Sequence, residues 1–481
     1  MKNNKSLMVI CTSLLLLIST KPILPNQTSQ TTFIPRPFSE NLALQNVLSN
    51  YEFYHNNYEK KPYTFPQEHA IFSLENVIFY GESTNKANMA RYFLLGNKTE
   101  LSVKENNSGD IGSLWLNLNN GNDTFSGTFK IRPLRRTLGT TVSYFQDFSK
   151  ILPHTWLNLS LPIVKISHKL AFSETITGPK GTTAGITTIF DALNNKNWCY
   201  GKFASKRSVS GLDDINAKIG FNFKVKKQNH FGAYGFLILP TGTKPTAEYI
   251  FEPLIGNGHH VGLGLGFTYG WQILDKSNVK LDLLVEANLQ HLYPAKELRS
   301  FDLKNGQWSR YLQVARDGTP GTPYPGINFF TKELKVFPRN NFEFLGALHY
   351  KYKQINVELG YNLWFKNSED VELENPWDYA DEYNIGIYDI QNGTISASTA
   401  TINNANPTQD ATFTRIQSTD LDLESAAQKR KSSQTVYLAA GLNSFIFRVP
   451  SLTGIGFSYE VADSNTAMSQ WTVFFKQVFS F

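Results

Sequence analysis

The chain ends with the sequence WTVFFKQVFSF, residues 471–481, and this stretch decides the fold. Residues of one parity are mainly aromatic: Trp471, Val473, Phe475, Phe479 and Phe481. Residues of the other parity include Thr472, Lys476 and Ser480. Successive side chains of a strand point to opposite faces of the sheet. The stretch therefore predicts a strand with one aromatic face and one mainly polar face.

The same period of two recurs along the chain, for example in residues 213–225, 259–273, 278–292 and 354–365. Each of these segments has ten or more residues, whereas strands of globular proteins usually have about five or six. A strand that crosses a bilayer at a tilt needs about 9–11 residues. These segments therefore predict strands that cross a membrane.

The spacing of the strands supports the same interpretation. We predict twelve: 125–132, 137–148, 154–164, 213–225, 231–240, 259–273, 278–292, 341–352, 354–365, 434–443, 453–461 and 469–481. From the third strand onward, long and short connections alternate up to the last hairpin. Transmembrane barrels have short periplasmic turns and long extracellular loops, and closure removes the sheet edges that hydrocarbon does not tolerate. We predict an all-β fold, a transmembrane antiparallel β-barrel of about 12 strands (range 10–14), with long extracellular loops and short periplasmic turns.

The N-terminal residues predict export. Residues 1–20, MKNNKSLMVICTSLLLLIST, have two lysines, an apolar run and then small residues, which is typical of a signal peptide. Residues 21–124 are predicted to form an N-terminal periplasmic lead or plug, with two additional strands as the open alternative. Residues 125–481 are assigned to the transmembrane β-barrel. Cleavage after the leader leaves Cys199 as the single cysteine, so no internal disulfide is expected.

Composition narrows the possible partners. The formal net charge is only +6 over 481 residues, and no basic stripe interleaved with aromatics is present, so nucleic acid is not an expected partner. The expected partners are the lipids of a bacterial outer membrane and a small-molecule solute. The sequence makes no prediction about the oligomeric state.

No catalytic residue and no cofactor is predicted, because the chain has no G-x-S-x-G elbow, P-loop or H-E-x-x-H motif. A lipid-hydrolysing barrel is the enzyme alternative. No metal site is predicted either, because the neighbours His259 and His260 would face opposite sides of a strand. The acid-rich stretch 369–383 is interpreted as a solvated loop rather than a cation site.

The candidate site is the inward face of the barrel, because residues opposite the lipid face determine selectivity in a pore. The lumen-lining candidates are Lys218, Lys224, Lys280, Asp282, Glu286, Glu343, Glu358, Glu460 and Lys476. They predict a channel or transporter that passes small solutes, hydrophobic ones among them. Two alternatives stay open: cross-strand pairs that fill a narrow lumen, and a structural or host-contact barrel that acts through its surface loops.

Two further features concern the wall and its constriction. Glycines at 262, 264, 266 and 270 leave a strip of wall without side chains, so either another segment packs there or the lumen is wider. The long connection 293–340, which contains GTPGTPYPG, is a candidate for folding inward.

The terminal strand resembles the C-terminal strand of bacterial outer-membrane β-barrel proteins, which ends in Phe with apolar residues at alternate positions. That resemblance implies that Trp471, Val473, Phe475, Phe479 and Phe481 are read by the barrel-assembly machinery. Three further stretches resemble the fatty-acid and aromatic-compound transporter group of the outer membrane: GLDDINAKIGFNF (211–223), LILPTGTKP (237–245) and GNGHHVGLGLGF (256–267). This second resemblance implies passage of small, often hydrophobic molecules.

Overall fold

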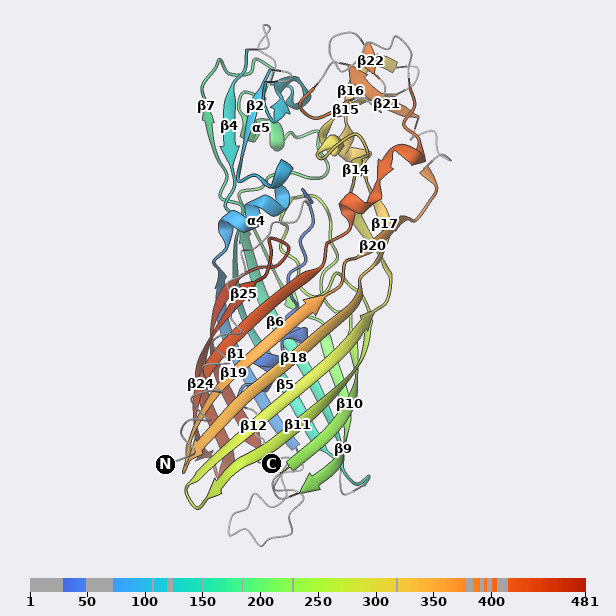
Figure 1. Cartoon of the computed structure of the whole chain (residues 1–481). Coiled ribbons are helices and arrows are strands. Elements are labelled where there is room, and N and C mark those ends of the chain that lie inside the picture. The colour runs from blue at the N-terminus through green and yellow to red at the C-terminus, as the bar shows by residue number, and fades with distance from the viewer. Residues whose placement is uncertain are drawn as a thin grey trace, which may run out of the picture.

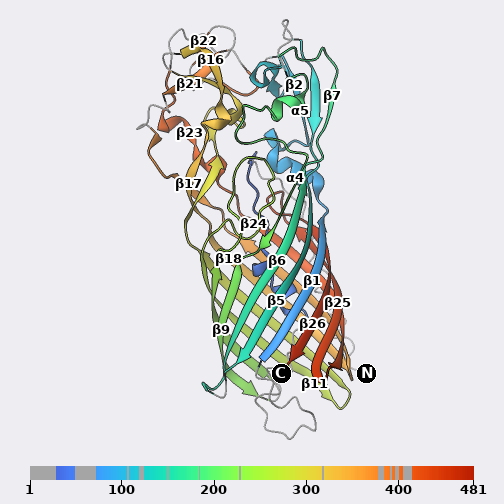
Figure 2. The same cartoon turned by 180° about the vertical axis from the view of Figure 1, so that it is seen from behind.

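Twelve long antiparallel strands form a closed wall in the computed structural model (Figures 1 and 2). The structure describes residues 29–48, 72–105, 108–118, 124–148, 151–183, 185–226, 229–316, 319–377, 384–389, 393–395, 400–404 and 414–481. The predicted signal peptide lies outside these residues. The wall strands are β1 (Phe72–Ser83), β5 (Leu134–Asp147), β6 (Thr155–Lys169), β9 (Ile215–Lys226), β10 (Asn229–Leu239), β11 (Gly262–Lys276), β12 (Val279–Leu292), β18 (Arg339–Tyr352), β19 (Ile355–Lys366), β24 (Lys431–Ile446), β25 (Val449–Ala462) and β26 (Gln470–Ser480).

The order of the strands confirms the predicted barrel and corrects where it begins. Neighbours in sequence pair around the wall, β5 pairs with β6, and β1 lies between β5 and β26, so the sheet has no open seam there. The predicted first strand at 125–132 is wrong, because β4 (Gly127–Lys130) belongs to a separate small sheet. The wall instead starts at Phe72, inside the region assigned to a lead or plug.

One wall strand is interrupted. The short strand β8 (Lys206–Leu212) continues the line of β9 along β6, and Asp213 and Asp214 lie between them. β6 pairs with β9 near its start and with β8 near its end. The predicted strand at 213–225 is therefore correct for β9, and β8 extends it within a segment predicted as loop.

The outer surface of the wall is apolar. Alternate residues of the strands expose large hydrophobic side chains; Leu265 is 73% exposed, and Val473, Phe475 and Phe481 are also exposed. An outward apolar band on a closed barrel suits contact with hydrocarbon. The aromatic face of β26 thus lies on the lipid side, which answers why the last strand alternates as it does.

The glycine-rich strip of β11 is filled from the neighbouring strand. The rings of Phe236 and Tyr234 on β10 lie over Gly264 and Gly266, so close that a Cβ atom at either glycine would be 2.2–2.3 Å from a ring carbon. The strip therefore neither widens the lumen nor receives a distant segment at these two positions. It accommodates aromatic rings across the β10–β11 pair.

The long connections form a folded cap over one end of the wall, while the short turns lie at the other end (Figure 1). One lobe contains α4 (Lys86–Phe93), η3 (Leu95–Asn97), β2 (Glu100–Lys104), β3 (Ile111–Gly112), η4 (Ser113–Leu116), β4, β7 (Ser173–Ile176) and α5 (Ile189–Leu193). The other contains β13 (Ala295–Ser300), β14 (Asp302–Leu303), η5 (Ser309–Tyr311), β15 (Gln313–Arg316), β16 (Thr319–Pro325), η6 (Gly326–Asn328), β17 (Thr331–Phe337), β20 (Asp370–Leu373), β21 (Ile385–Asp389), β22 (Gly393–Ile395), η9 (Ser418–Asp420), β23 (Leu421–Asp422) and η10 (Leu423–Ala426).

The two lobes share one hydrophobic core. Trp115 in the first lobe donates its Nε1–H to the carbonyl of Thr401, and Trp308 in the second donates to the carbonyl of Phe93. All four residues belong to or adjoin a single buried apolar cluster that also includes Phe33. The cap is therefore a packed unit rather than a set of separate loops. No helix in the described ranges is both long and apolar enough to cross a membrane.

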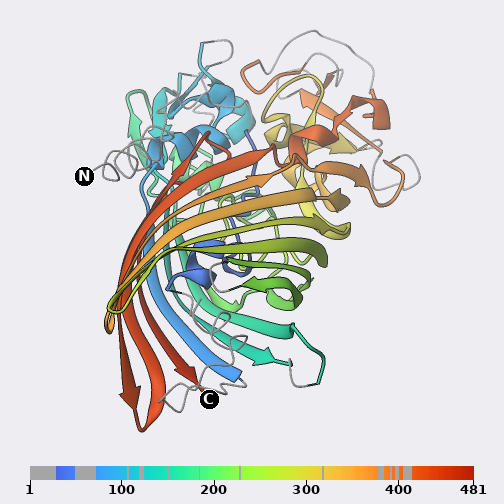
Figure 3. The same cartoon turned by 60° about the horizontal axis from the view of Figure 1, so that its bottom comes forward.

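The N-terminal segment, residues 29–48, runs from the cap into the barrel (Figure 3). It contains the short helices η1 (Phe38–Glu40) and α2 (Leu42–Asn46). Asn41 begins α2, and its side chain accepts a hydrogen bond from the Leu44 amide, as an N-cap residue does. We call residues 29–48 the lumen segment.

Candidate lumen site

The lumen segment packs an apolar face against the inner wall. Phe38 stacks on Phe79 of β1 with ring centroids 4.6 Å apart. Leu48 lies in a notch made by Gly441 and Gly454, where a Cβ atom at Gly454 would be 2.3 Å from the Leu48 side chain. From Phe38 onward, the segment's buried apolar residues belong to the same cluster as inward residues of several wall strands. Burial of this face stabilises the segment in the lumen.

Buried charges fix the middle of the segment. Arg36 forms an ion pair with Glu343 of β18, and both side chains are almost fully buried. The same carboxylate accepts hydrogen bonds from the Leu42 amide, at 2.7 Å, and from Asn362, at 3.0 Å. Glu343 thus binds a side chain and a backbone group of the segment together.

A second set of polar contacts surrounds η1. The carboxylate of Glu40 accepts hydrogen bonds from Gln290 of β12 and Asn341 of β18, each at 3.0 Å. The amide of Phe38 donates to Asp213, at the break between β8 and β9, over 2.7 Å. The backbone of η1 is therefore held by wall residues on several sides.

The end of the segment has its own anchors. The Leu48 amide donates to Glu358 of β19 at 3.1 Å, and Tyr437 donates to the other oxygen of that carboxylate at 2.7 Å. Lys476 of β26 donates to the carbonyl of Val47 at 2.7 Å and pairs with Glu75 at 2.8 Å. A cation beside the last carbonyls of α2 is electrostatically favourable.

A cavity lies between the lumen segment and the short-turn end of the barrel. Its volume, including open solvent at its mouth, is about 1110 Å³. Asn46 of the segment donates to Glu286 at 2.8 Å, and Tyr234 donates to the same carboxylate at 2.6 Å. Lys218 lies 3.5 Å from Glu286. Aromatic rings complete much of the lining, among them Phe145, Trp156 and Tyr437.

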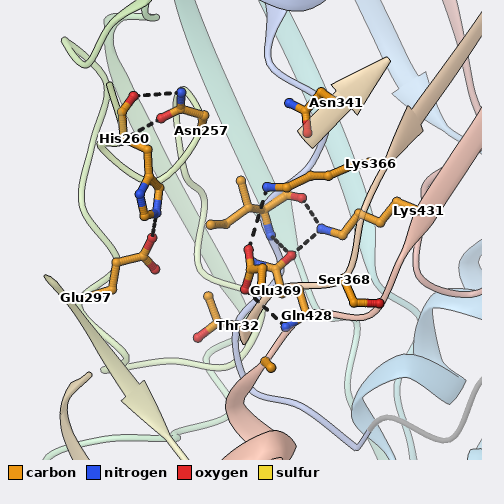
Figure 4. A network of polar contacts seen from close by, with 12 residues as sticks. Thr32, Asn257, His260, Glu297, Asn341, Lys366, Ser368, Glu369, Gln428 and Lys431 are labelled. Atoms are coloured by element: carbon orange, nitrogen blue, oxygen red, sulfur yellow. Dashed lines mark hydrogen bonds and ion pairs between the residues drawn. The ribbon is translucent and has the colours of Figure 1, made fainter. Parts of the chain in front are cut away.

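A polar network links the segment to the cap (Figure 4). Lys431 donates to the carbonyl of Ile34, whose amide donates to Gln428. The backbone N–H of Gln428 donates to the carboxylate of Glu369 at 3.1 Å, and the Arg299 guanidinium lies 3.4 Å from that carboxylate.

The network continues to a buried acid and histidine. Arg299 and His260 each lie 2.7 Å from a carboxylate oxygen of Glu297. Burial favours the neutral carboxyl, but the Arg299 guanidinium and His260 outweigh it and lower the pKa of Glu297 to about 2. Glu297 is therefore ionised at neutral pH and helps hold the cap side chains in place.

The predicted lumen residues fall into three groups. Glu286, Glu343, Glu358, Glu460 and Lys476 approach the lumen segment, and Lys218 pairs with Glu286. Asp282 is buried and Lys280 half-buried on β12, whereas the side chain of Lys224 lies outside the described part of the structure. Most of these charges therefore contact the segment or one another, and their part in selectivity stays a prediction.

Several residues of the site were not predicted. Arg36 and Glu40 lie in a stretch interpreted as a lead or plug, and Arg135, Asp213 and Lys431 were not singled out. The run LALQNVL, residues 42–48, was the available signal, because an Asn precedes it and its apolar residues recur at helical spacing. The connection 293–340, a candidate for folding inward, instead supplies strands of the cap.

Histidines and acids do not gather into a metal centre within the described residues. His260 is buried against Glu297, while His259 is half-buried with Nδ1 3.4 Å from the Gly242 carbonyl. Of the acid-rich stretch 369–383, Glu369 is buried in the network above, which corrects the interpretation of that residue as solvated. Asp378, Asp381 and Glu382 lie outside the described residues.

Comparisons with known proteins identify outer-membrane structures of the same general kind. An outer membrane channel from Pseudomonas putida F1 is 8% identical, with a TM-score of 0.40 over 88% of this chain and 100% of the other. A FadL homologue from Pseudomonas aeruginosa is 10% identical, with a TM-score of 0.27 over 88% and 94% of the two chains. A variant of the TodX monoaromatic hydrocarbon channel is 8% identical, with a TM-score of 0.34 over 87% and 92%. No protein-family model and no curated protein matches.

The closed wall and its apolar outer band define the class: this protein is a β-barrel of the bacterial outer membrane. Outer-membrane lipids are therefore its surroundings. The site inside the barrel is a segment of the chain itself, held above a cavity.

Proposed function

We propose that the protein is an outer-membrane channel or transporter for small solutes, and that the lumen segment closes it. The observation that carries the proposal is the contact pattern of residues 29–48. Their backbone joins no strand of the wall and is held mainly by side chains such as Glu343, Glu358 and Lys476. Such a segment can leave without breaking the wall's hydrogen-bond ladder.

The cavity below the segment is the site where a solute would reside. Aromatic rings and the charged pair Lys218–Glu286 line the same space. A solute with a flat apolar part and a polar group would satisfy both surfaces. Both charge signs are present, so we expect weak selectivity between cations and anions.

Single-channel conductance of the full mature chain in a planar bilayer tests this function. We expect the native protein to be closed for most of the time. The double substitution Arg36→Ala with Lys476→Ala removes one anchor at each end of the contact region, and we expect it to raise the open probability at least tenfold. The matched control is Arg136→Ala, because Arg136 is exposed and forms its ion pair with Glu82 at the barrel surface.

The test has a clear contrary result. If proteolysis shows that the segment is released in the double variant and the bilayer current is still unchanged, the barrel is not a channel gated by this segment. In that case, liposomes that contain the double variant would also take up small aromatic solutes with a polar group no faster than liposomes that contain the native protein.

A surface-contact function is the second candidate, and the shared core of the cap favours it. Loops that only connect strands do not need a buried cluster containing Trp115, Trp308 and Trp377. A folded cap can present a defined surface to another cell. Cells that display the protein would adhere to host cells or matrix better than cells with a capless barrel, and equal adhesion would exclude this role.

A further inference from the structure

A second, much smaller cavity lies between the lumen segment and the inner face of the wall, in the half of the barrel nearer the cap. Arg36 of the segment, Arg135 of β5 and Lys431 of β24 line it, together with Trp364 of β19 and Glu460 of β25. Arg36, Arg135 and Lys431 are 8%, 2% and 2% exposed. Three cations from three parts of the chain therefore meet in a space largely closed to solvent.

Hydrogen-bond donors around this cavity lack acceptors. Nε and Nη1 of Arg36, Nε of Arg135 and Nε1 of Trp364 are buried and have no hydrogen-bond partner among the described residues. The nearby acceptors serve other donors: Ser433 and Gln470 donate to the two oxygens of Glu460, and Nη1 of Arg135 donates to the side-chain oxygen of Gln470. A buried donor without an acceptor costs about 1–3 kcal/mol, so four around one cavity indicate a missing acceptor.

Two of the three cations also lack a carboxylate in direct contact. Arg36 pairs with Glu343 and lies 3.8 Å from Glu460. Within the described ranges, no carboxylate comes within 4 Å of the charged groups of Arg135 or Lys431. Arg135 and Lys431 are thus buried with no carboxylate in direct contact, and Glu460 and Asp213 near Arg135 and Glu369 near Lys431 compensate their charges only at longer range.

Aromatic faces give these cations partial compensation only. The guanidinium of Arg135 lies 5.4 Å from the ring centroid of Phe38, and the ammonium of Lys431 lies 4.9 Å from that of Phe33. A ring attracts a cation through its quadrupole, but it carries no net charge. It also does not provide a strong hydrogen-bond acceptor for each N–H group. The orphan donors, and the two cations without a direct carboxylate partner, therefore remain.

We propose that this cavity binds one small monovalent anion, of which chloride is the abundant example, between Arg36, Arg135 and Lys431. Such an ion accepts several N–H donors at once and places negative charge in direct contact with Arg135 and Lys431. A water molecule would satisfy donors but not the charge. Because Arg36 belongs to the lumen segment and Arg135 to the wall, the anion ties the segment to β5.

Bromide is the probe for the direct test, because it replaces chloride and scatters anomalously at an accessible X-ray wavelength. Crystals of the full mature chain are grown in sodium bromide at neutral pH. We expect one strong anomalous peak in the cavity, within hydrogen-bond distance of Arg36 and Arg135. The absence of a peak there at saturating bromide, with ordered side chains around it, overturns the proposal.

Thermal unfolding in detergent gives a second, independent readout. At constant ionic strength, replacing sodium gluconate by sodium chloride should raise the melting temperature saturably by a few degrees. Arg135→Gln should abolish the rise, and Arg136→Gln, the exposed neighbour on the lipid side, should retain it. Equal responses of both variants would contradict the site. If Arg135→Gln does not fold, the bromide crystal of the unaltered chain decides. Neither readout depends on conductance.

Discussion

At the scale of single residues, Arg36 and Glu343 are the pair on which the lumen segment depends most directly. Both side chains are at most 5% exposed, and Glu343 also accepts the Leu42 amide. Removing one partner of a buried ion pair usually costs about 3–5 kcal/mol, because the other charge stays buried without compensation. This loss weakens the binding of the lumen segment to the wall. It does not weaken the wall itself, because the hydrogen bonds between the wall strands do not include these contacts.

We therefore expect Arg36→Met to release the lumen segment while the barrel stays folded. Limited proteolysis of the purified protein should cut within residues 29–48 at least tenfold faster than in the native chain. Heat-modifiable migration on a detergent gel checks that the wall is intact. Arg136→Met is the control and should leave the cleavage rate unchanged; equal protection of Arg36→Met would show that apolar packing alone holds the segment.

A second residue-scale prediction concerns acid. The pKa of Glu297 falls from an ordinary 4.5 to about 2 in the folded cap. The contribution of Glu297 to the free energy of unfolding is fully present above about pH 4.5. It is lost as the pH falls toward 2, because the carboxyl of the unfolded chain takes up a proton at a higher pH than the carboxyl of the folded chain. Over that window the loss is roughly 3 kcal/mol.

Hydrogen exchange of the cap amides between pH 5 and pH 2.5, corrected for the intrinsic exchange rate, measures this effect. We expect the protection of β13 and β17 to decline with falling pH in the native protein. In Glu297→Gln the protection should be lower at pH 5 and should change less over the same interval. A native protein whose cap protection is constant over this range would contradict the prediction.

At the scale of elements, the β10–β11 pair depends on glycine. Tyr234 covers Gly266, and a Cβ atom there would lie 2.3 Å from its ring. Tyr234 also donates a hydrogen bond to Glu286, so the ring has little freedom to move away. Overpacking of a filled site typically costs about 1–3 kcal/mol.

Gly266→Leu should accordingly destabilise the barrel by about this amount. Equilibrium unfolding in urea with refolding into detergent measures it. Phe267→Leu, one residue further along, changes a side chain on the lipid face, where Phe267 is 45% exposed, and should have a much smaller effect. If both variants unfold at the same urea concentration, Tyr234 can relocate and the strip tolerates side chains.

At the scale of the whole molecule, wall, cap and lumen segment form one connected unit. The segment begins among cap residues, where the carbonyl of Ser29 accepts a hydrogen bond from Arg310, and ends beside Glu358 near the lower cavity. A change in the cap is thus coupled through a single stretch of chain to the lumen.

The sequence by itself determined the barrel. A strict period of two over ten or more residues is a local property of each segment, so it can be recognised in the sequence without knowing which strand is the partner. Eleven of the twelve wall strands, the alternation of long and short connections and the lipid-facing side of β26 followed from it, and the total of twelve agreed because the wrong strand at 125–132 offset the wall strand β1. The first wall strand, β1, Phe72–Ser83, was left among the alternatives for residues 21–124, because it alternates less regularly than the others.

Only the tertiary structure decided what fills the lumen. Which residues meet across a closed barrel depends on the registers of twelve strands. The sequence of residues 29–48 has no pattern that shows where this segment binds. Glu343 and Lys476 could be placed on the inward face from parity, but their partners Arg36 and Val47 lie 307 and 429 positions away in the chain. Parity fixes the side of a sheet on which a residue lies, whereas contact across the lumen is set by the closure of the whole wall.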